Sequence, residues 1–511
     1  MGVLAVAAAV AAGHLVAGIV SPGSSPFLAV GDAVVRLSPQ WLTEFAKSAF
    51  GTADKVVLLA AMGVVIAGVA AGAGLLTRRR TAPGTAVVSV LGLAGFAAVM
   101  AQPAFAPLDL LAPSAALLAG IVVLRRLHAL AGRSAQSAAR PARESGSEGT
   151  RVAVSRRDVL VWASAGVGAA SLLAIGGGTL LSRGAGDSRA TVTARLAAAR
   201  LAQAAPPIPA GAAFPELGTP TFLTAAASFY RIDVALGIPR LAAEDWTLRV
   251  HGMVDREVTL TFDDLMARPL VERTITMTCV SNPVGGDLIS TANFVGIDLR
   301  DLLLEAGVRP GADQAFATSV DGWYTGTPVD VLMQPDRGAM LAVGMNGEAL
   351  LPEHGFPVRM VVPGLYGYVS ATKWISDLEL TTFAARSGYW LERGWAERGP
   401  VKTGSRIDRP RSSSTVPAGT VTLAGIAWSQ PDGITRVEVR ADGGPWVVAD
   451  LASDVSGDTW RMWRADLDLV PGEHTLEARA TAGTGTVQPE PRTSPIPDGA
   501  TGWPAVLVTA R

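Results

Sequence analysis

Five apolar runs of roughly membrane-spanning length constrain this chain more than any other feature of its sequence. A helix needs about 20 apolar residues to cross the hydrocarbon core of a bilayer. The runs lie at Met1–Val20, Val56–Leu76, Ala86–Ala101, Leu108–Leu124 and Val159–Leu181. The sequence therefore predicts a transmembrane anchor of five helices over residues 1–182, with the lipid bilayer as a partner.

Arginine residues gather in two of the loops that join these runs. Arg78, Arg79 and Arg80 follow the second run, and eight further arginines lie between the fourth run and the fifth. Loops rich in Lys and Arg stay on the cytoplasmic side of a membrane. Threading the chain accordingly places its first residue inside and everything after Leu181 outside. We expect a multi-pass protein of the cytoplasmic membrane whose second half is extracytoplasmic.

The fifth run is preceded by two adjacent arginines in the segment Ser155–Leu160. This segment resembles a twin-arginine export signal, which serves proteins that are exported already folded. The arginines are also compatible with simple positive-inside anchors, and both interpretations give the same topology. His14 and His128 are the only histidines in this half, and His128 is expected to lie beyond its helix, so the paired ligands of a bis-histidine haem site are missing.

The composition changes after the fifth run, and residues 183–213 are expected to form a linker. This stretch is rich in Ala and Arg and ends in prolines. Such a composition is typical of a short helix or stalk followed by a connecting segment.

Two folded domains are expected in the second half. Between residues 214 and 406, strand-like runs such as Trp246–Val250 and Val358–Val362 alternate with helix-like runs such as Leu299–Ala306, which is an α+β pattern. Residues 407–511 instead contain short strand-like runs joined by Gly, Asp and Pro turns, a spacing typical of a β-sandwich. These runs lie at Val421–Trp428, Arg436–Ala441, Trp446–Leu451, Trp460–Ala465 and His474–Thr481. The predicted fold is thus multi-domain.

Cys279 is the only cysteine, so no disulfide can form within the chain. A lone cysteine is most often a small buried hydrophobe. Here, however, Thr276–Pro283 runs from a β-prone stretch into a turn, which would hold the thiol at the end of a strand. A thiolate is a soft ligand that suits molybdenum or copper. One thiolate alone means that a cofactor would have to supply the other ligands.

A second cluster combines glycines with cationic side chains, in His354–Gly364 and Gly367–Trp374. Glycines let backbone N–H groups approach an anion, Arg359 can grip phosphate oxygens bidentately, and Lys373 adds a point charge. The pattern indicates a phosphate or pyrophosphate site. A core strand flanked by solvated charges is the alternative interpretation.

Two further segments carry weaker signals. Ser228–Asp233 places Arg231 between aromatic and acidic neighbours, which is also the pattern of an ordinary salt bridge. Asp321–Tyr324 begins with Asp-Gly, which is usually no more than a turn. Neither segment predicts a site by itself.

Taken together and in this order, the motifs resemble those of the sulfite oxidase family of molybdopterin enzymes. The resemblance covers about residues 214–511. It rests on Phe229-Tyr230-Arg231, the strand Trp246–Gly252, the Thr-Cys-x-x-Asn turn at 278–282, His354–Gly364 and Lys373-Trp374. It extends to the tail, where Ile434–Val439, Trp460–Trp463 and Gly472–His474 look like the family's immunoglobulin-like dimerisation domain. The resemblance thus implies a sulfite oxidase-type domain at 214–406, an immunoglobulin-like domain at 407–511, and a homodimer as an expected assembly.

The resemblance implies that the cofactor is molybdenum-molybdopterin (Mo-pterin) and that Cys279 is the protein ligand of the metal. Cys279 and Arg231 would be the catalytic residues, with Arg231 facing the substrate pocket as well as the pterin. The residues implied to bind the cofactor are Phe229, Tyr230, Arg231, Asp233, Cys279, Asp321, His354, Arg359, Ala371, Thr372 and Lys373.

The chemistry implied is oxygen-atom transfer on a small-molecule substrate such as sulfite or a sulfoxide, outside the cytoplasm. In such enzymes the metal changes by two electrons while the protein positions the cofactor. The chain lacks the haem-binding domain of animal sulfite oxidases, so a separate electron acceptor or donor is expected, linked to a cytochrome or a quinone. Lys plus Arg (43) and Asp plus Glu (44) nearly balance, so no overall field points to nucleic acid as a partner.

Two departures from the family pattern leave the substrate open. Val280–Val284 contains no arginine where sulfite oxidases place basic residues after the cysteine, so an anion pocket would be weaker here. Trp395 falls at about the place of the family's active-site tyrosine, so a hydroxyl donor near the metal would be lost. The alternative hypothesis is a non-enzymatic membrane receptor or interaction module that keeps the fold. Such a module has no physical need for Cys279, Arg359 and Lys373 together.

Overall fold

The computed structural model describes residues 1–39, 42, 45, 46, 49, 50, 53–77, 80–102, 105–138, 165, 169 and 184–511. The chain divides into two compact units. Unit 1 comprises Met1–Ala185 together with Asp233–Arg240, and unit 2 comprises Gly186–Ile232 and Leu241–Arg511. A short segment that the sequence places between two parts of unit 2 therefore belongs to the N-terminal unit.

Unit 1 is helical in the part that the structure describes. Its elements are α1 (Gly2–Val20), η1 (Pro22–Ser24), α2 (Pro26–Leu37), α4 (Asp54–Leu76), α5 (Thr81–Met100), η3 (Pro107–Leu110) and α6 (Leu111–Ala138). Four helices are long and apolar enough to cross a membrane, namely α1, α4, α5 and the span Pro107–Ala129, and they confirm the first four predicted runs. The fifth run, Val159–Leu181, lies outside the described residues except for Ala165 and Ala169, and so does all of Ser155–Leu160.

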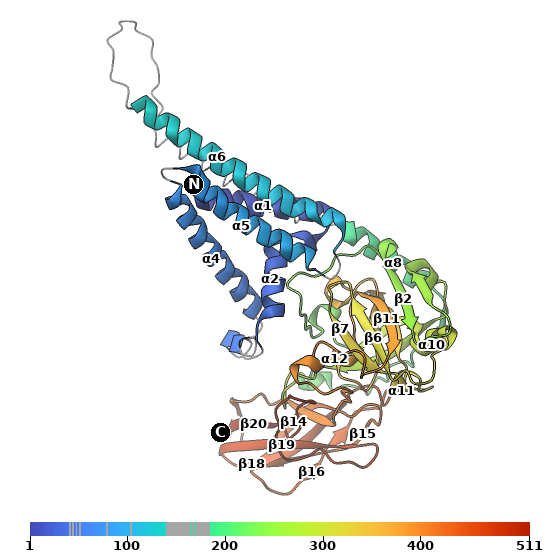
Figure 1. Cartoon of the computed structure of the whole chain (residues 1–511). Helices are drawn as coiled ribbons and strands as arrows, with labels where there is room; N and C mark the ends of the chain where they lie inside the picture. Colours follow the sequence, from blue (N-terminus) through green and yellow to red (C-terminus); the bar gives the residue numbers. More distant parts are fainter. Residues whose placement is uncertain are drawn as a thin grey trace. The chain divides into compact units, whose positions relative to one another are not determined.

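Small residues let the helices of unit 1 approach one another closely. A Cβ at Gly2 of α1 would stand 1.9 Å from the Ala70 carbonyl oxygen of α4, and one at Gly120 of α6 would stand 3.0 Å from Val88 of α5. The buried centre consists of Ala5, Val6, Ala70, Val88 and Leu124. Figure 1 shows α1, α5 and α6 running side by side. Packing through Gly and Ala is common where helices associate inside a bilayer.

The first part of unit 2 contains two sheets. One has the strand order β1-β4-β5-β8-β10 with β9 paired to β8, and the other has the order β3-β2-β11-β6-β7. The first sheet consists of β1 (Leu201–Gln203), β4 (Leu270–Thr278), β5 (Ile289–Asp298), β8 (Met340–Met345), β9 (Glu348–Ala349) and β10 (Arg359–Val361). The second consists of β2 (Thr247–Gly252), β3 (Val258–Thr261), β6 (Gln314–Ser319), β7 (Tyr324–Pro328) and β11 (Ile375–Thr381). The predicted strands around 246–250 and 358–362 are confirmed.

Short helices connect these strands, which confirms the α+β pattern. The α-helices are α8 (Gly184–Ala198), α9 (Phe262–Met266), α10 (Leu299–Ala306), α11 (Val329–Leu332) and α12 (Gly367–Ser370). The 3-10 turns are η4 (Pro215–Leu217), η5 (Ala226–Ser228), η6 (Ala243–Asp245), η7 (Pro352–His354) and η8 (Leu391–Arg393). In α10 the Asp298 carboxylate accepts hydrogen bonds from the amides of Arg300 and Asp301, and Gly307 ends the helix in the left-handed region.

The expected linker over 183–213 requires a correction, because most of it folds into unit 2. Strand β1 pairs in parallel with β4, and Val192 of α8 and Ala212 are buried in the core of unit 2. The short helix that the composition indicated is α8, whereas a strand of three residues is too short to leave a periodic pattern.

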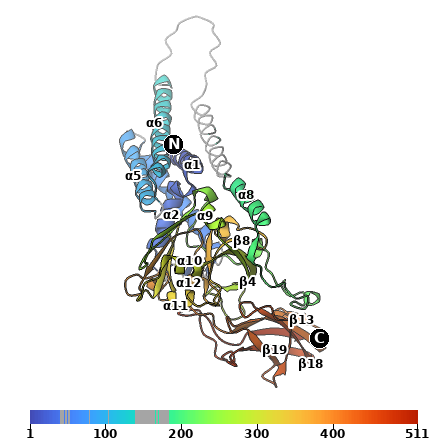
Figure 2. The ribbon, with the colours of Figure 1, turned by 90° about the vertical axis from the view of Figure 1, so that its right-hand side faces the viewer.

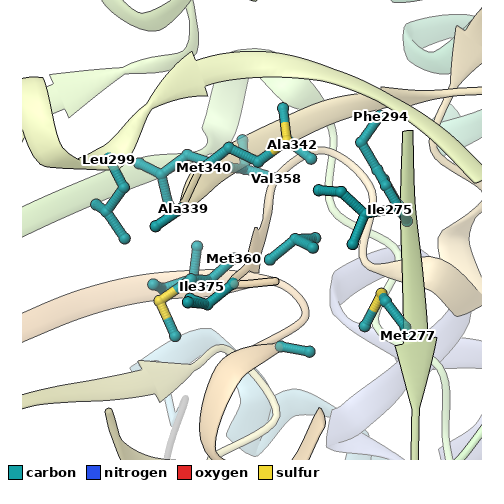
Figure 3. Close-up of a cluster of buried hydrophobic side chains, with 14 of the residues drawn as sticks. Ile275, Met277, Phe294, Leu299, Ala339, Met340, Ala342, Val358, Met360 and Ile375 are labelled. Atoms are coloured by element: carbon teal, nitrogen blue, oxygen red, sulfur yellow. The ribbon is translucent and has the colours of Figure 1, made fainter. Parts of the chain in front are cut away.

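A single apolar core joins the two sheets and holds the strand ends that later carry the site. Figure 3 shows Ile275 and Met277 of β4 gathered with Met360 of β10 and Ile375 of β11, all of them buried. Because Met277 precedes Cys279 by two residues and Met360 follows Arg359, this core restrains the backbone at both positions.

The last part of unit 2 contains two further sheets around a second core. Their orders are β12-β14-β18-β17 and β13-β20-β19-β15-β16, and the labels β13, β18 and β19 mark them in the C-terminal, red part of Figure 2. The strands are β12 (Gly404–Arg409), β13 (Ser414–Val416), β14 (Gly419–Trp428), β15 (Ile434–Ala441), β16 (Val447–Val448), β17 (Asp450–Leu451), β18 (Arg461–Leu469), β19 (Gly472–Ala482) and β20 (Ala505–Ala510). Buried and exposed residues alternate along β18, so a β-rich C-terminal region with two packed sheets is confirmed.

The C-terminal sheets also support strand β4 directly. The backbone amide of Trp460 donates to Thr276 Oγ1 at 2.7 Å, and the amide of Thr276 donates to the Asp458 carbonyl at 2.9 Å. Gln430 Nε2 donates to the same Asp458 carbonyl at 2.8 Å. These buried hydrogen bonds lie three residues before Cys279, so the C-terminal region helps to set the end of β4.

Candidate active site

Cys279 lies immediately after β4, as predicted, and a closed turn holds it there. Its amide donates to the Leu288 carbonyl at 2.9 Å, while its own carbonyl accepts from the Asn282 amide at 3.0 Å. The Asn282 side-chain oxygen accepts from the Leu288 amide at 3.0 Å, which closes the turn. The Cys279 side chain is buried, with 8% of its surface exposed. The thiol is therefore fixed in position by backbone hydrogen bonds on both sides.

Cys279 contributes to the raised pKa values of two buried tyrosine hydroxyls, Tyr230 and Tyr366. Burial raises the pKa of Tyr230, and a Cys279 thiolate raises this pKa further, while the positive charge of Arg359 opposes the rise. Burial raises the pKa of Tyr366 to about 12, with smaller contributions from Asp498 and Cys279. Both phenols therefore stay protonated at neutral pH and can act as hydrogen-bond donors.

These tyrosines change the expectation that Trp395 leaves the site without a hydroxyl donor. Trp395 is buried, with its ring centroid 6.0 Å from that of Tyr368 and 6.3 Å from that of Trp390. It is thus part of an aromatic cluster, whereas Tyr230 and Tyr366 are the hydroxyls that respond to Cys279.

The Phe-Tyr-Arg motif packs against His354. The Phe229 ring stacks on Tyr230 at 5.5 Å and meets the His354 ring edge-on at 5.6 Å. His354 is only 3% exposed, and its Nε2 lies 2.8 Å from the Ala226 carbonyl oxygen. Burial lowers the pKa of His354 to about 4, and the positive charge of Arg359 adds to this effect. At neutral pH the imidazole is therefore uncharged.

Two cations converge on the same region. Arg359, only 5% exposed, donates from Nη1 to the His354 carbonyl at 3.3 Å and from Nη2 to the Ala371 carbonyl at 3.4 Å. Lys373 donates from Nζ to the Ile232 carbonyl at 3.2 Å and to the Glu353 carbonyl at 3.1 Å. The backbones of Arg359 and Lys373 also form a β-bridge. The two positive charges are thus held side by side next to the Phe-Tyr-Arg motif.

Gly355 makes this close approach of the two cationic residues possible. Its φ is +102°, and a Cβ there would stand 3.0 Å from the Cα and Cβ of Lys373 and 3.1 Å from the Cβ of Arg359. Gly367 plays a similar part, since a Cβ there would stand 3.2 Å from the Tyr230 hydroxyl. A larger side chain at either position would displace residues of the site.

Two buried hydroxyls border this region without a protein partner. Among the residues that the structure describes, Thr278 Oγ1 and Thr372 Oγ1 are buried and make no hydrogen bond. Thr278 is 2% exposed and Thr372 is fully buried. Buried polar atoms are rarely left unsatisfied in folded proteins, so each exception calls for a ligand or water.

The structure brings most of the predicted cofactor residues together. Contacts and electrostatic effects described above connect Phe229, Tyr230, Cys279, His354, Arg359, Ala371 and Lys373. Thr372 lies between Ala371 and Lys373 in the sequence. Arg231 is exposed and adjoins Ile232, whose carbonyl accepts from Lys373. Asp321 caps a turn by accepting from the Trp323 amide at 3.0 Å, and the amide of Val320 donates to the Trp374 carbonyl. This hydrogen bond joins the backbone beside Asp321 to the residue that follows Lys373.

Asp233 differs from the other predicted residues, because its segment belongs to unit 1. Its carbonyl oxygen accepts a hydrogen bond from Lys55 Nζ at 2.8 Å. A role for Asp233 in holding the pterin therefore stays a prediction.

The sequence carries no individual signal for four further residues of the site, namely Thr278, Tyr366, Gly355 and Gly367. All four stand inside or beside the quoted motifs, so their positions were visible. Their contribution to the site cannot be predicted from the sequence, because the effect of an unsatisfied hydroxyl or a missing Cβ depends on neighbours that the tertiary fold supplies.

The residues fit a molybdenum-pterin cofactor. Within the described part of the chain, no group of three or more His, Cys, Asp or Glu side chains could hold a metal ion. A metal at Cys279 would thus have one protein ligand and need a cofactor to complete its coordination. The buried cations suit an anionic phosphate, and the two unsatisfied threonine hydroxyls suit a polar ligand.

Comparisons with known proteins agree with this geometry. Residues 235–390 match the family described as oxidoreductase molybdopterin binding domain. The chain is similar to mitochondrial sulfite oxidase of Homo sapiens, with 30% identity over 54% of this chain and 59% of that protein. It is 34% identical to the oxidoreductase YuiH of Bacillus subtilis over 30% of this chain and 74% of that protein.

Among solved structures, the sulfane dehydrogenase SoxCD of Paracoccus pantotrophus is similar to this chain at a TM-score of 0.47 and 25% identity, covering 56% of this chain and 79% of that one. The chain spans only 59% of the length of the mitochondrial sulfite oxidases that it matches.

Proposed function

The chain belongs to the sulfite oxidase family of molybdopterin-dependent oxidoreductases, and we propose that it is a membrane-anchored member that catalyses oxygen-atom transfer. The substrate class is a small molecule such as sulfite or a sulfoxide, outside the cytoplasm. Oxidation of sulfite to sulfate would take one oxygen atom from water, release two protons and pass two electrons to an acceptor.

The observation that carries this proposal is the environment of Cys279. A buried thiol at a strand end adjoins protonated tyrosines and a pair of buried or half-buried cations. A structural cysteine in an apolar core would not need these neighbours.

The roles of the residues follow from their chemistry. Cys279 would ligate the metal, while Arg359, Lys373 and neutral His354 would hold the pterin and its phosphate. Thr372 and Thr278 would donate or accept hydrogen bonds that they lack in the protein alone. When bound, the cofactor would supply the two-electron chemistry of the transfer.

The chain's own residues would bind and orient the substrate. The exposed guanidinium of Arg231 can attract an anion such as sulfite, which compensates for the lack of arginine at 280–284. Tyr230 and Tyr366, whose raised pKa values keep their hydroxyls protonated, can donate hydrogen bonds to oxygen atoms near Cys279. The buried His354 stays neutral near neutral pH, and its one N–H donates to the Ala226 carbonyl, so the ring offers a ligand only an acceptor at Nδ1.

The membrane setting is also proposed. The four apolar helices support attachment to a bilayer, and we infer a fifth span at Val159–Leu181 from its composition. With arginine-rich loops inside, the second half would be extracytoplasmic on the cytoplasmic membrane. Electrons would then pass to a separate partner, linked to a cytochrome or a quinone.

The domain assignment belongs to the same proposal. The membrane anchor would occupy residues 1–182, the catalytic domain 214–406 together with the strand and helix that precede it, and an immunoglobulin-like domain 407–511. The two packed sheets of the last region support this assignment. A homodimer formed through it is the expected assembly.

The decisive experiment is elemental analysis with pterin fluorescence on the full chain purified in detergent, comparing wild type with Cys279→Ser. We expect about one molybdenum per chain in the wild type and loss of both metal and turnover in the variant. Serine is nearly isosteric with cysteine, so the melting temperature should change by only a few degrees. Matured wild-type protein without molybdenum and pterin would overturn the proposal and favour a non-enzymatic membrane interaction module.

A further inference from the structure

The chain that follows Cys279 forms a loop over residues 280–288, called here the 280–288 loop. Besides the hydrogen bonds that close the turn at Cys279 and Asn282, the Gly286 amide donates to the Pro283 carbonyl at 2.9 Å. The loop contains no helix or strand. Its position therefore depends on bonds that other parts of the fold supply.

Arg406 of β12 supplies such a bond to the middle of the loop. Its Nη1 donates to the Gly286 carbonyl oxygen at 3.1 Å. Strand β12 belongs to the C-terminal sheets, where it pairs with β14. The bond thus joins two segments that are 120 residues apart in the sequence, and both of them lie in unit 2.

Gly286 is packed tightly against the turn that holds Cys279. A Cβ at Gly286 would stand 2.4 Å from Asn282 Oδ1 and 2.7 Å from Pro283 Cδ. Asn282 Oδ1 accepts from the Leu288 amide, and the Leu288 carbonyl accepts from the Cys279 amide. One packing contact and two hydrogen bonds therefore connect the residue that Arg406 holds to the backbone of Cys279.

Asp408 fixes the direction of the Arg406 guanidinium. Its Oδ1 accepts from Arg406 Nε at 2.7 Å, and the two side chains are largely buried, with 11% of Arg406 and 12% of Asp408 exposed. Burial raises the pKa of Asp408, and the positive charge of Arg406 opposes this rise. Because Asp408 compensates its charge, Arg406 acts on the loop as a directed hydrogen-bond donor and not as a cation that attracts substrate.

We propose that Arg406 and Asp408 are positioning residues, which hold the 280–288 loop against the C-terminal sheets and thereby fix the direction of the Cys279 thiol. The inference rests on the proposed function for the role of Cys279 as the metal ligand. It gives the C-terminal sheets a hold on both sides of the thiol. Trp460 bonds to β4 before Cys279, and Arg406 bonds to the loop after it.

The first test measures how fast the Cys279 thiol reacts with N-ethylmaleimide in the full chain, prepared without the cofactor and kept in detergent. Cys279 is the only cysteine, so the reaction reports on this residue alone. Because its side chain is buried, labelling requires the loop to open. The labelling rate then follows the population of the open form.

Two variants of Arg406 are compared with a matched control. Arg406→Met removes the donor. Arg406→Lys keeps a positive charge beside Asp408 but cannot reproduce the N–H directions of the guanidinium, and it provides a folded variant if methionine at this buried pair prevents folding. The control is Arg440→Met, since Arg440 of β15 forms a comparably buried pair with Glu477 at 2.7 Å and, among the described residues, makes no hydrogen bond to the 280–288 loop.

We expect labelling to be about tenfold faster or more in both Arg406 variants, and within about twofold of the wild-type rate in Arg440→Met. Arg406→Lys should keep its melting temperature within a few degrees of the wild type, because the ion pair remains. Labelling of both Arg406 variants at the wild-type rate would overturn the proposal. Equal acceleration in Arg440→Met would overturn it too, since the effect would then come from a general loss of stability.

The second test uses the full chain loaded with molybdenum cofactor. We expect the visible absorption of the oxidised protein to shift in Arg406→Lys, because thiolate-to-metal charge transfer depends on the direction of the sulfur ligand. With sulfite as the probe and ferricyanide as the acceptor, kcat should fall about tenfold and KM should change by less than about twofold. An unchanged spectrum and an unchanged kcat alongside faster labelling would overturn the positioning role. Wild-type protein without molybdenum would instead overturn the proposed function, while the labelling experiment would still decide whether Arg406 holds the loop.

Discussion

The imidazole Nε2 of His354 lies 2.8 Å from the carbonyl oxygen of Ala226, and this contact ties the cationic glycine-rich stretch to the Phe-Tyr-Arg motif. Because a carbonyl oxygen can only accept, the hydrogen bond requires the proton of the neutral imidazole to be on Nε2. The ring is then a donor toward Ala226, and its Nδ1 is unprotonated.

Stability should depend on pH through His354. Its pKa falls from 6.5 to about 4 on folding, so the unfolded chain binds a proton between these values that the folded chain does not. The contribution of neutral His354 to the free energy of unfolding is therefore complete above about pH 6.5. It is lost as the pH drops toward about 4, and the loss is at most about 3 kcal/mol. Melting curves at about pH 7 and about pH 5 should show a steeper loss for wild type than for His354→Gln. Equal losses of stability in wild type and His354→Gln would contradict the lowered pKa of His354.

Lys373→Met should weaken retention of the cofactor. The substitution keeps the aliphatic stem but removes the charge beside the Phe-Tyr-Arg motif, and we expect about 10- to 100-fold weaker binding of the pterin. The matched control is Arg309→Met, since Arg309 pairs with Asp255 at 3.1 Å and, among the described residues, has no hydrogen bond to a residue of the proposed site. Pterin fluorescence after extended dialysis measures the difference. Equal pterin loss in the two variants would count against a phosphate role for Lys373.

Thr372→Val should have opposite effects on the empty and the loaded protein. The Thr372 hydroxyl is buried without a partner, so its removal should stabilise cofactor-free protein by about 1–2 kcal/mol. The same change should lower pterin retention in loaded protein. Thr327→Val is the control, because the Thr327 hydroxyl donates to the Val369 carbonyl and its loss should destabilise both forms. Melting temperatures with and without cofactor provide the measurement; destabilisation of the empty protein by Thr372→Val would refute the argument.

Gly355→Ala should lower stability and pterin retention by more than the strain of a positive φ alone would cause. The new Cβ would meet Lys373 and Arg359 at 3.0–3.1 Å. Gly394 also has a positive φ, but a Cβ there would meet nothing within 4 Å, so Gly394→Ala should show only the backbone cost of about 1 kcal/mol. We expect Gly355→Ala to lose at least twice as much stability and to retain less pterin. Equal melting temperatures in the two variants would show that the cations move aside without cost.

Local patterns in the sequence predicted the elements that carry the site. The helix expected at Leu299–Ala306 begins and ends at those residues, and Cys279 lies after the strand that its β-prone neighbours indicated. Apolar periodicity, turn residues and capping side chains act over a few residues, so they can be read without knowledge of the fold.

Relationships between distant segments could not be read in the same way. The segment 183–213 was expected to be a linker, yet its strand β1 finds a partner some 70 residues later in β4. A strand of three residues is stable only as part of a sheet, and its own sequence does not specify which sheet.

By itself, the sequence determined the apolar helices, the single thiol at a strand end and the cationic glycine-rich stretch. Only the tertiary structure decided that Asp233 joins the helical unit through Lys55 and that Thr278 and Thr372 keep unsatisfied hydroxyls. The physical reason is that secondary structure follows from neighbours along the chain. Whether a buried polar group is satisfied depends instead on which distant residues the packed fold places beside it.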